Sequence, residues 1–327
     1  MTDIVTVDIG GTHARFALAR QTAGGGIELD EPVTLATDDH ASFQTAWEDY
    51  RARQGGTLPK AVTMAIAGPV VGEIIRFTNN PWIIRPALVC SKLGVEHYTI
   101  VNDFEAVAHA VARLPAEQFQ HLTGPDQPLG SQGTISVIGP GTGLGVAHLW
   151  RSGTGDYHVQ ATEGGHIDFA PLDQIEDAIL ARLRKRHNRV SVERVVAGPA
   201  ISDIYQTLAA LEGRAVAGED DIAIWEAGMA DREALAAAAV DRFCLSLGSV
   251  AGDIALAQGG FAGVVIAGGL GLRLKDQLLQ SGFAERFRAK GRFEQLMRSI
   301  PVKLITYPQP GLYGAAAAFF RQHGASL

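Results

Sequence analysis

Short apolar runs of strand character alternate with amphipathic, helix-like stretches along almost the whole chain. We predict strands over residues 4–9, 13–19, 27–35, 61–67, 97–101, 134–138, 146–150, 264–267 and 302–306, and an extended segment over 70–78. We predict helices over residues 41–54, 87–93, 104–114, 174–186, 201–211, 232–258 and 312–322. Asp38 or Asp39 is the expected cap of the first helix. Interleaved strands and helices indicate an α/β protein with mixed sheets.

Two strand–turn–strand units follow the same pattern. Gly10 and Gly11 separate the first two strands, which predicts a hairpin. The glycine-rich segment 139–145 separates strands 134–138 and 146–150 in the same way. We therefore predict a duplicated, two-lobed chain, with a stretch rich in Gly, Pro and Asp at 122–133 as the break between lobes.

Composition limits the classes of function. A chain of 327 residues exceeds one ordinary core, and 46% hydrophobic residues with 19% charged residues are typical of a folded soluble protein. A net charge of -7 and 7% aromatic residues argue against a nucleic-acid partner, which requires basic patches. The basic run 182–189 is interpreted as the polar face and C-terminal end of a helix.

Cys90 and Cys244 lie far apart and have no partners at zinc-ligand spacing, so we predict no disulfide framework, as in a reducing cytoplasm. We predict no membrane partner, because no apolar run reaches the roughly 20 residues that a membrane helix needs. The N-terminus lacks the pattern of a signal peptide.

Glycine turns between strands are suited to phosphate binding, because several backbone N–H groups can face one anion where no Cβ blocks it. Asp8 ends the first strand and can hold a hydrated Mg²⁺, and Thr12 can offer a hydroxyl to a phosphate. A glycine-rich hairpin or a strand-to-helix turn is the purely structural alternative. The candidate phosphate- and nucleotide-binding residues are Asp8, Gly10, Gly11, Thr12, Gly141, Thr142, Gly143, Gly268 and Gly269. P-loop and dinucleotide-binding spacings are absent.

Several segments resemble the motifs of the bacterial glucokinase family, within the hexokinase–actin–Hsp70 superfamily. The first phosphate motif of that family resembles DIGGTHAR at residues 8–15. Its second phosphate motif is similar to 139–145, its adenosine motif to 267–271, and a further match lies at 307–311. The resemblance covers almost the whole chain and implies a two-lobed, ribonuclease-H-like (actin-like ATPase) α/β fold with an interlobe cleft. We expect a small lobe of residues 1–112 plus 308–327 and a large lobe of 113–307.

The resemblance also implies a sugar site. Asp103, after Asn102 at a strand end, occupies the place of the catalytic base, and a carboxylate there can accept the proton of a weakly acidic hydroxyl. A helix N-cap is the structural alternative for Asp103. Glu163 and His166 match the sugar-binding loop, and Glu193 matches a third sugar-contacting acid. The structural alternatives are a turn histidine for His166 and an exposed acid at a helix start for Glu193. Asn79 and Asn80 lie in a turn near Pro81 that can close over a sugar.

Three departures from related families bear on these assignments. The cysteine cluster that accompanies a similar Glu-x-Gly-His in a zinc-containing repressor and kinase family is absent, so His166 is not predicted as a zinc ligand. Gly139 and Pro140 stand at the head of the second turn, where hexokinase-type relatives carry an aspartate. Ala200 ends a segment that resembles a family Gly-Pro-Gly.

The predicted function is transfer of the γ-phosphoryl group of Mg-ATP to the 6-hydroxyl of glucose, with closure of the lobes on the sugar. A kinase for mannose, fructose or an N-acetyl amino sugar is the alternative within enzymes. A sugar-sensing regulator and an actin-like or chaperone-type ATPase are the alternatives in other classes. ADP or polyphosphate as donor stays open at this point. The resemblance implies a homodimer, and residues 232–258 are either an interface or part of the core.

Overall fold

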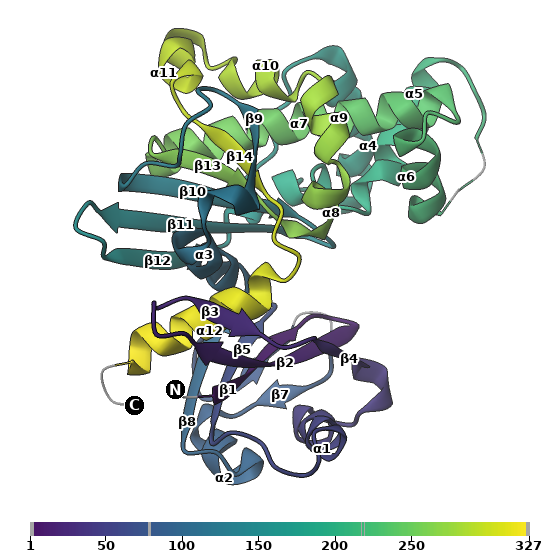
Figure 1. The fold of residues 1–327 in the computed structure, drawn as a ribbon. Helices are drawn as coiled ribbons and strands as arrows, with labels where there is room; N and C mark the ends of the chain where they lie inside the picture. Colours follow the sequence, from purple (N-terminus) through teal and green to yellow (C-terminus); the bar gives the residue numbers. More distant parts are fainter. Residues whose placement is uncertain (1–2, 78–79, 217, 219, 325–327) are drawn as a thin grey trace. The chain divides into compact units, whose positions relative to one another are not determined.

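The computed structural model describes residues 3–77, 80–216, 218 and 220–324, and the chain divides into two compact units (Figure 1). Unit 1 comprises Met1–Pro115 and Tyr307–Leu327, and unit 2 comprises Ala116–Thr306. The chain thus leaves unit 1 once and returns to it for its last helix.

Unit 1 is built on a six-stranded mixed sheet with the order β3-β2-β1-β5-β8, in which β4 also pairs with β2. The first three strands of this order are antiparallel, and β1, β5 and β8 are parallel. The strands are β1 (Asp3–Ile9), β2 (His13–Gln21), β3 (Ile27–Leu29), β4 (Val33–Ala36), β5 (Ala61–Ile66) and β8 (His97–Asn102), and a small separate pair is β6 (Ile75–Arg76) and β7 (Ile83–Ile84).

The helices of unit 1 are α1 (Phe43–Arg53), α2 (Val89–Leu93), α3 (Asp103–Arg113) and α12 (Pro310–His323). Two buried threonines fix α12 on the sheet: Thr6 donates to the carbonyl of Leu312, and Thr63 to the carbonyl of Ala315. A Cβ at Gly314 would lie 1.7 Å from the carbonyl oxygen of Ala106, so glycine is required where α12 crosses α3. The last helix is therefore an integral part of the N-terminal unit.

Unit 2 repeats this plan. Its six-stranded sheet has the order β12-β11-β10-β13-β14-β9, in which β10, β13 and β14 are parallel and the other pairs are antiparallel. The strands are β9 (Phe119–Thr123), β10 (Gln132–Pro140), β11 (Leu144–Ser152), β12 (Tyr157–Thr162), β13 (Gly263–Ile266) and β14 (Val302–Ile305). A hairpin followed by parallel strands in both sheets agrees with the predicted duplication.

The helices of unit 2 are α4 (Gln174–His187), α5 (Ala200–Leu211), α6 (Asp221–Met229), α7 (Ala234–Gln258), α8 (Gly268–Arg273), α9 (Lys275–Gln280), α10 (Phe283–Arg288) and α11 (Glu294–Arg298). Single 3₁₀ turns are η1 (Thr37–Asp39), η2 (Pro86–Leu88), η3 (Ala116–Gln118), η4 (Gly164–His166), η5 (Val192–Arg194) and η6 (Gly291–Phe293).

Helix α7 is the central core helix of unit 2. Leu235, Phe243 and Leu247 are fully or almost fully buried in the main hydrophobic cluster of this unit. The prediction that no stretch reaches membrane-spanning length is wrong for α7, which is long and apolar enough by length and composition. However, 67% of its most apolar window is buried inside the protein, as in the core helix of a water-soluble domain. Residues 232–258 were predicted to form either an interface or part of the core. Burial of α7 inside unit 2 shows that the core accounts for its apolar surface.

Several local predictions were wrong. The single strand over 27–35 is two strands, β3 and β4, because Pro32 has no N–H for a continuous ladder. The cap of α1 is Ser42, which forms a capping box with Thr45, rather than Asp38 or Asp39. Of the extended segment over 70–78, only Ile75–Arg76 is a strand, and residue 78 lies outside the described residues. The stretch 122–133 lies within unit 2, since the strands on both sides of it, β9 and β10, belong to one sheet.

Candidate active site

The carboxyl ends of the three parallel strands of unit 1 meet at one edge of its sheet. Ile9 on β1 is in register with Ile66 on β5, which is in register with Asn102 on β8. The residues that follow these positions therefore share this edge, as is common for ligand sites in α/β folds. They include the first predicted phosphate turn and Asp103.

Asp8 lies one residue before the end of β1, with a side chain that is 24% exposed. Burial raises the pKa of its carboxyl above the usual value, and Arg15, 3.5 Å away across the hairpin, opposes this shift. The start of α12 packs against the same carboxylate: a Cβ at Gly311 would lie 3.0 Å from its Oδ2. The first turn of a helix favours a negative charge, so α12 helps to keep Asp8 ionised.

The first phosphate turn has an open side and a supported side. Gly10 donates its N–H to the carbonyl of His13, and a Cβ at Gly10 would have no contact closer than 3.6 Å. Thr12 is exposed, and its Oγ1 lies 2.9 Å from Nδ1 of His13. On the supported side, the buried Asn80 side chain donates to the carbonyl of Gly10. The turn is thus open beside Gly10, and the exposed Thr12 side chain lies next to this open side.

The amide of Asn80 is committed to structure, because its oxygen also accepts from the N–H of Trp82, 2.9 Å away. Asn79, the other asparagine of this predicted sugar turn, lies outside the described residues. Support of the first phosphate turn is therefore the role that the contacts of Asn80 indicate.

Asn102, and not Asp103, caps helix α3. The side-chain oxygen of Asn102 accepts from the N–H groups of Phe104 and Glu105, at 2.9 and 3.1 Å, and Glu105 completes the capping box. The alternative of Asp103 as the N-cap is therefore wrong, because Asp103 is the first residue of the helix itself. Asn102 also donates to the carbonyl of Gly68, at 3.1 Å, which fixes this strand end to the loop after β5.

The second phosphate turn, between β10 and β11, is held by hydrogen bonds to Glu193 and Gly198, which lie about fifty residues later in the chain. Gly198 donates its N–H to the carbonyl of Gly141, at 2.7 Å. The carboxylate of Glu193 accepts from the N–H of Leu144, at 2.9 Å. Since a Cβ at Gly143 would lie 2.5 Å from Oε2 of Glu193, the turn and this acid fit together only if residue 143 is glycine. The predicted phosphate turn and the predicted third sugar acid are thus direct neighbours.

The loop with Glu163 and His166 lies over the beginning of β11. Gly165 is required here, because its Cβ would lie 2.3 Å from the carbonyl oxygen of Leu144. The side chains of Glu163 and His166 are 64% and 58% exposed, and their nearest polar atoms are 4.0 Å apart. Leu144 therefore connects the phosphate turn, the Glu163–His166 loop and Glu193.

The predicted adenosine turn, at Gly268 and Gly269, packs against the end of β10, next to the second phosphate turn. Gly268 begins α8 and has a φ of 80°, and a Cβ there would lie 2.7 Å from the carbonyl oxygen of Pro140. A Cβ at Gly269 would meet nothing within 4 Å, so space remains beside this turn. Unit 2 therefore brings together Gly141, Thr142, Gly143, Glu163, His166, Glu193, Gly268 and Gly269 around one turn.

Sequence reasoning missed three residues that support these turns: Arg15, Gly198 and Gly311. Arg15 and Gly311 contact Asp8, and Gly198 holds Gly141. A signal was present in each case, since all three lie within segments that resemble family motifs. The contacts themselves depend on residues far apart in the chain, which no local pattern shows.

Asp8 is the carboxylate at the first phosphate turn that could bind Mg²⁺. Among the described residues, no group of three or more His, Cys, Asp or Glu side chains could form a protein cage for a metal. Mg²⁺ commonly keeps several waters and binds through one or two carboxylates together with substrate phosphates. A partly buried carboxylate beside a phosphate turn matches that requirement.

The matches to known proteins cover almost the entire chain. The sequence profile of a family described as glucokinase matches residues 5–323. The chain is 54% identical to a glucokinase of Zymomonas mobilis over 321 residues, which are 98% of each protein. The chain belongs to the glucokinase family. Its reaction is therefore the phosphorylation of glucose with ATP, as predicted from the sequence.

Solved structures support the glucokinase fold. A glucokinase from an Antarctic psychrotroph superposes with a TM-score of 0.85 and 33% identity, and the match covers 98% of this chain and 99% of the other. A glucokinase from Balamuthia mandrillaris, solved in complex with glucose, has a TM-score of 0.79 and 22% identity, with 97% and 93% covered. The predicted two-lobed, actin-like α/β fold with mixed sheets is confirmed.

Proposed function

We propose that this glucokinase-family chain phosphorylates the 6-hydroxyl of glucose and that Asp103 is the general base. The observation that carries the proposal is the capping of α3 by Asn102. Asn102 accepts from the N–H groups of Phe104 and Glu105, so the Asp103 carboxylate, whose Oδ1 shares the N–H of Phe104 at 2.9 Å, is not the only acceptor at the helix start. A half-buried carboxylate at the ligand-binding edge of a parallel sheet is well suited to accept a proton.

Phosphoryl transfer depends mainly on positioning and on stabilisation of charge. In the proposed step, the Asp103 carboxylate orients the 6-hydroxyl and accepts its proton as the oxygen attacks the γ-phosphorus. The bond between the γ-phosphorus and the bridging oxygen breaks, and ADP leaves. Asp103 contributes about 10²–10⁴-fold to the rate if it acts as such bases usually do.

We assign recognition of the sugar to Asn102, Glu163, His166 and Glu193, together with Asp103. Carboxylates suit this role because each oxygen accepts a hydrogen bond from a neighbouring hydroxyl, and an analogue without that hydroxyl leaves the oxygen unpaired. Support comes from Glu163 and His166, which are both exposed at one short turn, with 4.0 Å between Oε2 of Glu163 and Nε2 of His166.

The donor phosphates are assigned to the two glycine turns, with Gly10, Gly11 and Thr12 in one and Gly141, Thr142 and Gly143 in the other. Gly268 and Gly269 are assigned to the adenosine, where the open space beside Gly269 supports a close approach. Mg²⁺, held through water by Asp8, would neutralise charge on the donor phosphates.

The family resemblance also supports a cytoplasmic homodimer. Light scattering of the purified chain tests this part of the proposal: a mass of twice the monomer is expected, and a monomer at assay concentration would contradict it.

The position of phosphorylation can be tested with 6-deoxyglucose. This analogue retains the other hydroxyls but has no 6-hydroxyl to phosphorylate. We expect competitive inhibition against glucose and no release of ADP above that of ATP alone. Stoichiometric ADP release with 6-deoxyglucose would overturn the assignment of the 6-hydroxyl.

Breadth of substrate use is measured with glucose, mannose, fructose and N-acetylglucosamine at one ATP concentration. We expect the highest kcat/KM for glucose. A comparable kcat/KM for the N-acetyl sugar would instead identify a broad hexose kinase.

A further inference from the structure

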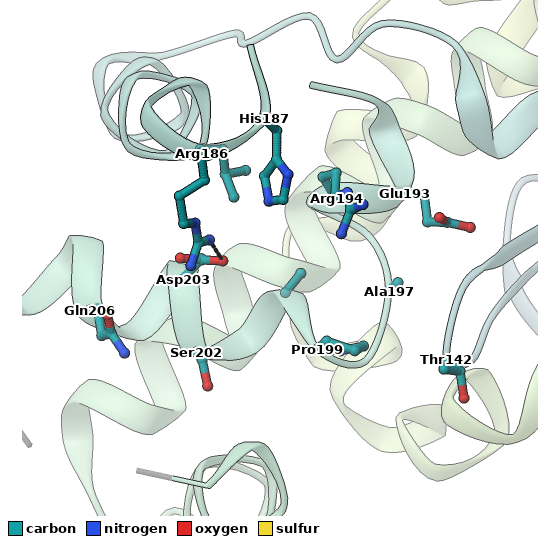
Figure 2. A pocket seen from close by; sticks show the side chains of 12 residues that line it. Thr142, Arg186, His187, Glu193, Arg194, Ala197, Pro199, Ser202, Asp203 and Gln206 are labelled. Carbon is teal, nitrogen blue, oxygen red and sulfur yellow. Dashed lines mark hydrogen bonds and ion pairs between the residues drawn. The ribbon is translucent and has the colours of Figure 1, made fainter. Parts of the chain in front are cut away.

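The basic run 182–189 is divided between two roles in the structure. Arg182 and Arg186 form ion pairs with Asp203 of α5, and Figure 2 shows the pair of Arg186 and Asp203 as a dashed line. Arg189 differs from them, because α4 ends two residues earlier and Arg189 lies beyond the helix. Its interpretation as part of a polar helix end therefore does not account for this residue.

The side chain of Arg189 reaches the loop that carries Glu163 and His166. Its Nη2 donates to the backbone carbonyl of His166, at 2.6 Å, and its Nε lies 2.6 Å from Oδ1 of Asp168. The planar guanidinium presents its N–H donors in fixed directions, so it can make both contacts at once. One side chain thereby binds two positions at the end of this loop.

Backbone hydrogen bonds join the same two parts of the chain. Residues 167–169 pair with residues 190–192 through N–H···O contacts of 2.9 and 3.0 Å, in a short antiparallel bridge. His166 directly precedes the first of these segments, and Glu193 directly follows the second. Figure 2 labels His187 and Glu193, between which the second segment runs. The bridge thus connects the two regions to which we assign recognition of the sugar.

The start and the end of the Glu163–His166 loop are supported differently. At the start, the hydroxyl of Thr162 accepts from the N–H of Gly164, at 3.3 Å, and donates to the carbonyl of Val146 on β11, at 3.0 Å. At the end, the carbonyl of His166 accepts from Arg189. The start of the loop is therefore fixed to the sheet, whereas the end is fixed by an arginine beyond α4.

The ion pair of Arg189 and Asp168 should matter little for global stability. Their side chains are 59% and 75% exposed, and exposed pairs of this kind contribute little to the free energy of unfolding. The local effect is different, because the carbonyl and the imidazole of His166 belong to one residue. A fixed carbonyl restricts the backbone rotation that would move this imidazole.

We propose that Arg189 is a positioning residue for sugar recognition. It holds the end of the Glu163–His166 loop beside the segment that leads to Glu193, and Asp168 orients its guanidinium. Binding groups that are already in place lose less conformational entropy when the ligand binds. The sugar role rests on the proposed function, whereas the effect of Arg189 on the loop itself does not.

The effect on the loop is measured by hydrogen exchange of the whole protein, in a peptide that covers residues 163–169. We expect Arg189→Ala to speed exchange in this peptide about threefold to tenfold, because the end of the loop opens more often. Arg184→Ala is the matched control, since it removes the same charge from an exposed position of α4 and should exchange like the wild type. Equal exchange by wild type and Arg189→Ala would overturn the proposal.

The consequence for the sugar is measured by initial rates with glucose and ATP varied separately. Arg189→Ala should raise the KM for glucose about threefold to tenfold and leave kcat, the KM for ATP and the midpoint of urea unfolding near the wild-type values. A merely structural role would instead change the unfolding midpoint and both KM values. The double variant with Asp168→Ala should have the same KM for glucose as Arg189→Ala, because Asp168 acts through Arg189.

His166→Ala distinguishes failure of this proposal from failure of the proposed function. If His166→Ala raises the KM for glucose and Arg189→Ala does not, the positioning role is wrong and the sugar-binding role of His166 stands. If Arg189→Ala speeds exchange in the loop but neither variant changes the KM for glucose, the assignment of this loop to the sugar is wrong, and the positioning role for the sugar fails with it.

Discussion

Glu193 accepts a hydrogen bond from the backbone N–H of Leu144, with 2.9 Å between the two atoms. This contact joins an acid predicted to bind the sugar to a turn predicted to bind the donor phosphates. The positions of the two groups are therefore coupled: movement of Glu193 alters the turn, and a change in the turn alters Glu193. Gly143, whose Cβ would meet Glu193 at 2.5 Å, restricts the pair further.

Replacement of Glu193 should separate its two functions. Glu193→Gln retains an oxygen that can accept from Leu144, so the KM for ATP should stay near the wild-type value while the KM for glucose rises. Glu193→Ala leaves the buried N–H of Leu144 unpaired, which costs about 1–3 kcal/mol, and both KM values should rise. Initial-rate measurements with each substrate varied decide this. An unchanged KM for ATP in Glu193→Ala would contradict the structural role.

Gly143→Ala should destabilise the protein as well as impair donor binding. The new methyl group would overlap with Oε2 of Glu193, and overpacking of this kind costs about 1–3 kcal/mol. Gly141→Ala is the matched variant, because its Cβ would have no neighbour closer than 4.0 Å. Its free energy of unfolding should stay within about 0.5 kcal/mol of the wild type. Urea unfolding compares the two, and equal stabilities would refute the steric argument.

Stability at low pH should depend on Asp173, which caps α4. Burial raises the pKa of its carboxyl, but the N–H of Glu176 and the guanidinium groups of Arg242 and Arg286 outweigh this and hold the pKa below its ordinary value. A carboxyl with a lowered pKa in the folded state stabilises the fold above its unfolded pKa, and this stabilisation is lost as the pH falls through the folded pKa.

Asp173→Asn retains a capping oxygen but removes the charge. It should lower the free energy of unfolding by about 1 kcal/mol at neutral pH, and the difference from wild type should disappear below the folded pKa of Asp173. Asp177→Asn, at an exposed acid of the same helix, is the control. A difference between Asp173→Asn and wild type that stays constant from neutral to strongly acidic pH would exclude the linkage.

Periodicity and glycine placement predicted much of the fold from sequence. The two hairpins and their duplicated arrangement follow from apolar runs around glycine turns, because such turns restrict the backbone to few conformations. Short helices such as α9 and α11 were missed, since five or six residues carry too little periodicity to identify them. The third predicted strand is divided at Pro32, and predicting this division would have required weighing the missing backbone N–H of Pro32 against the strand pattern on both sides.

The candidate site was predictable residue by residue but not in its contacts. Motifs located Asp8, Asp103 and Glu193, yet no pattern indicated that Asn102 would cap α3 in place of Asp103. Both residues are good caps, and the choice depends on which one ends β8. Likewise, the hydrogen bond between Glu193 and Leu144 spans 49 positions and exists only once unit 2 has folded.

The central claim, that Asp103 is the base for phosphorylation of glucose, is tested most directly by glucose-dependent release of ADP from Mg-ATP in wild type and Asp103→Asn. Asn102 caps α3, and the substitution retains a side-chain oxygen that can accept from the N–H of Phe104, so the variant should unfold like the wild type. We predict a loss of kcat of about 10²–10⁴-fold in Asp103→Asn. Turnover by Asp103→Asn at the wild-type rate, with the fold unchanged, would contradict the account.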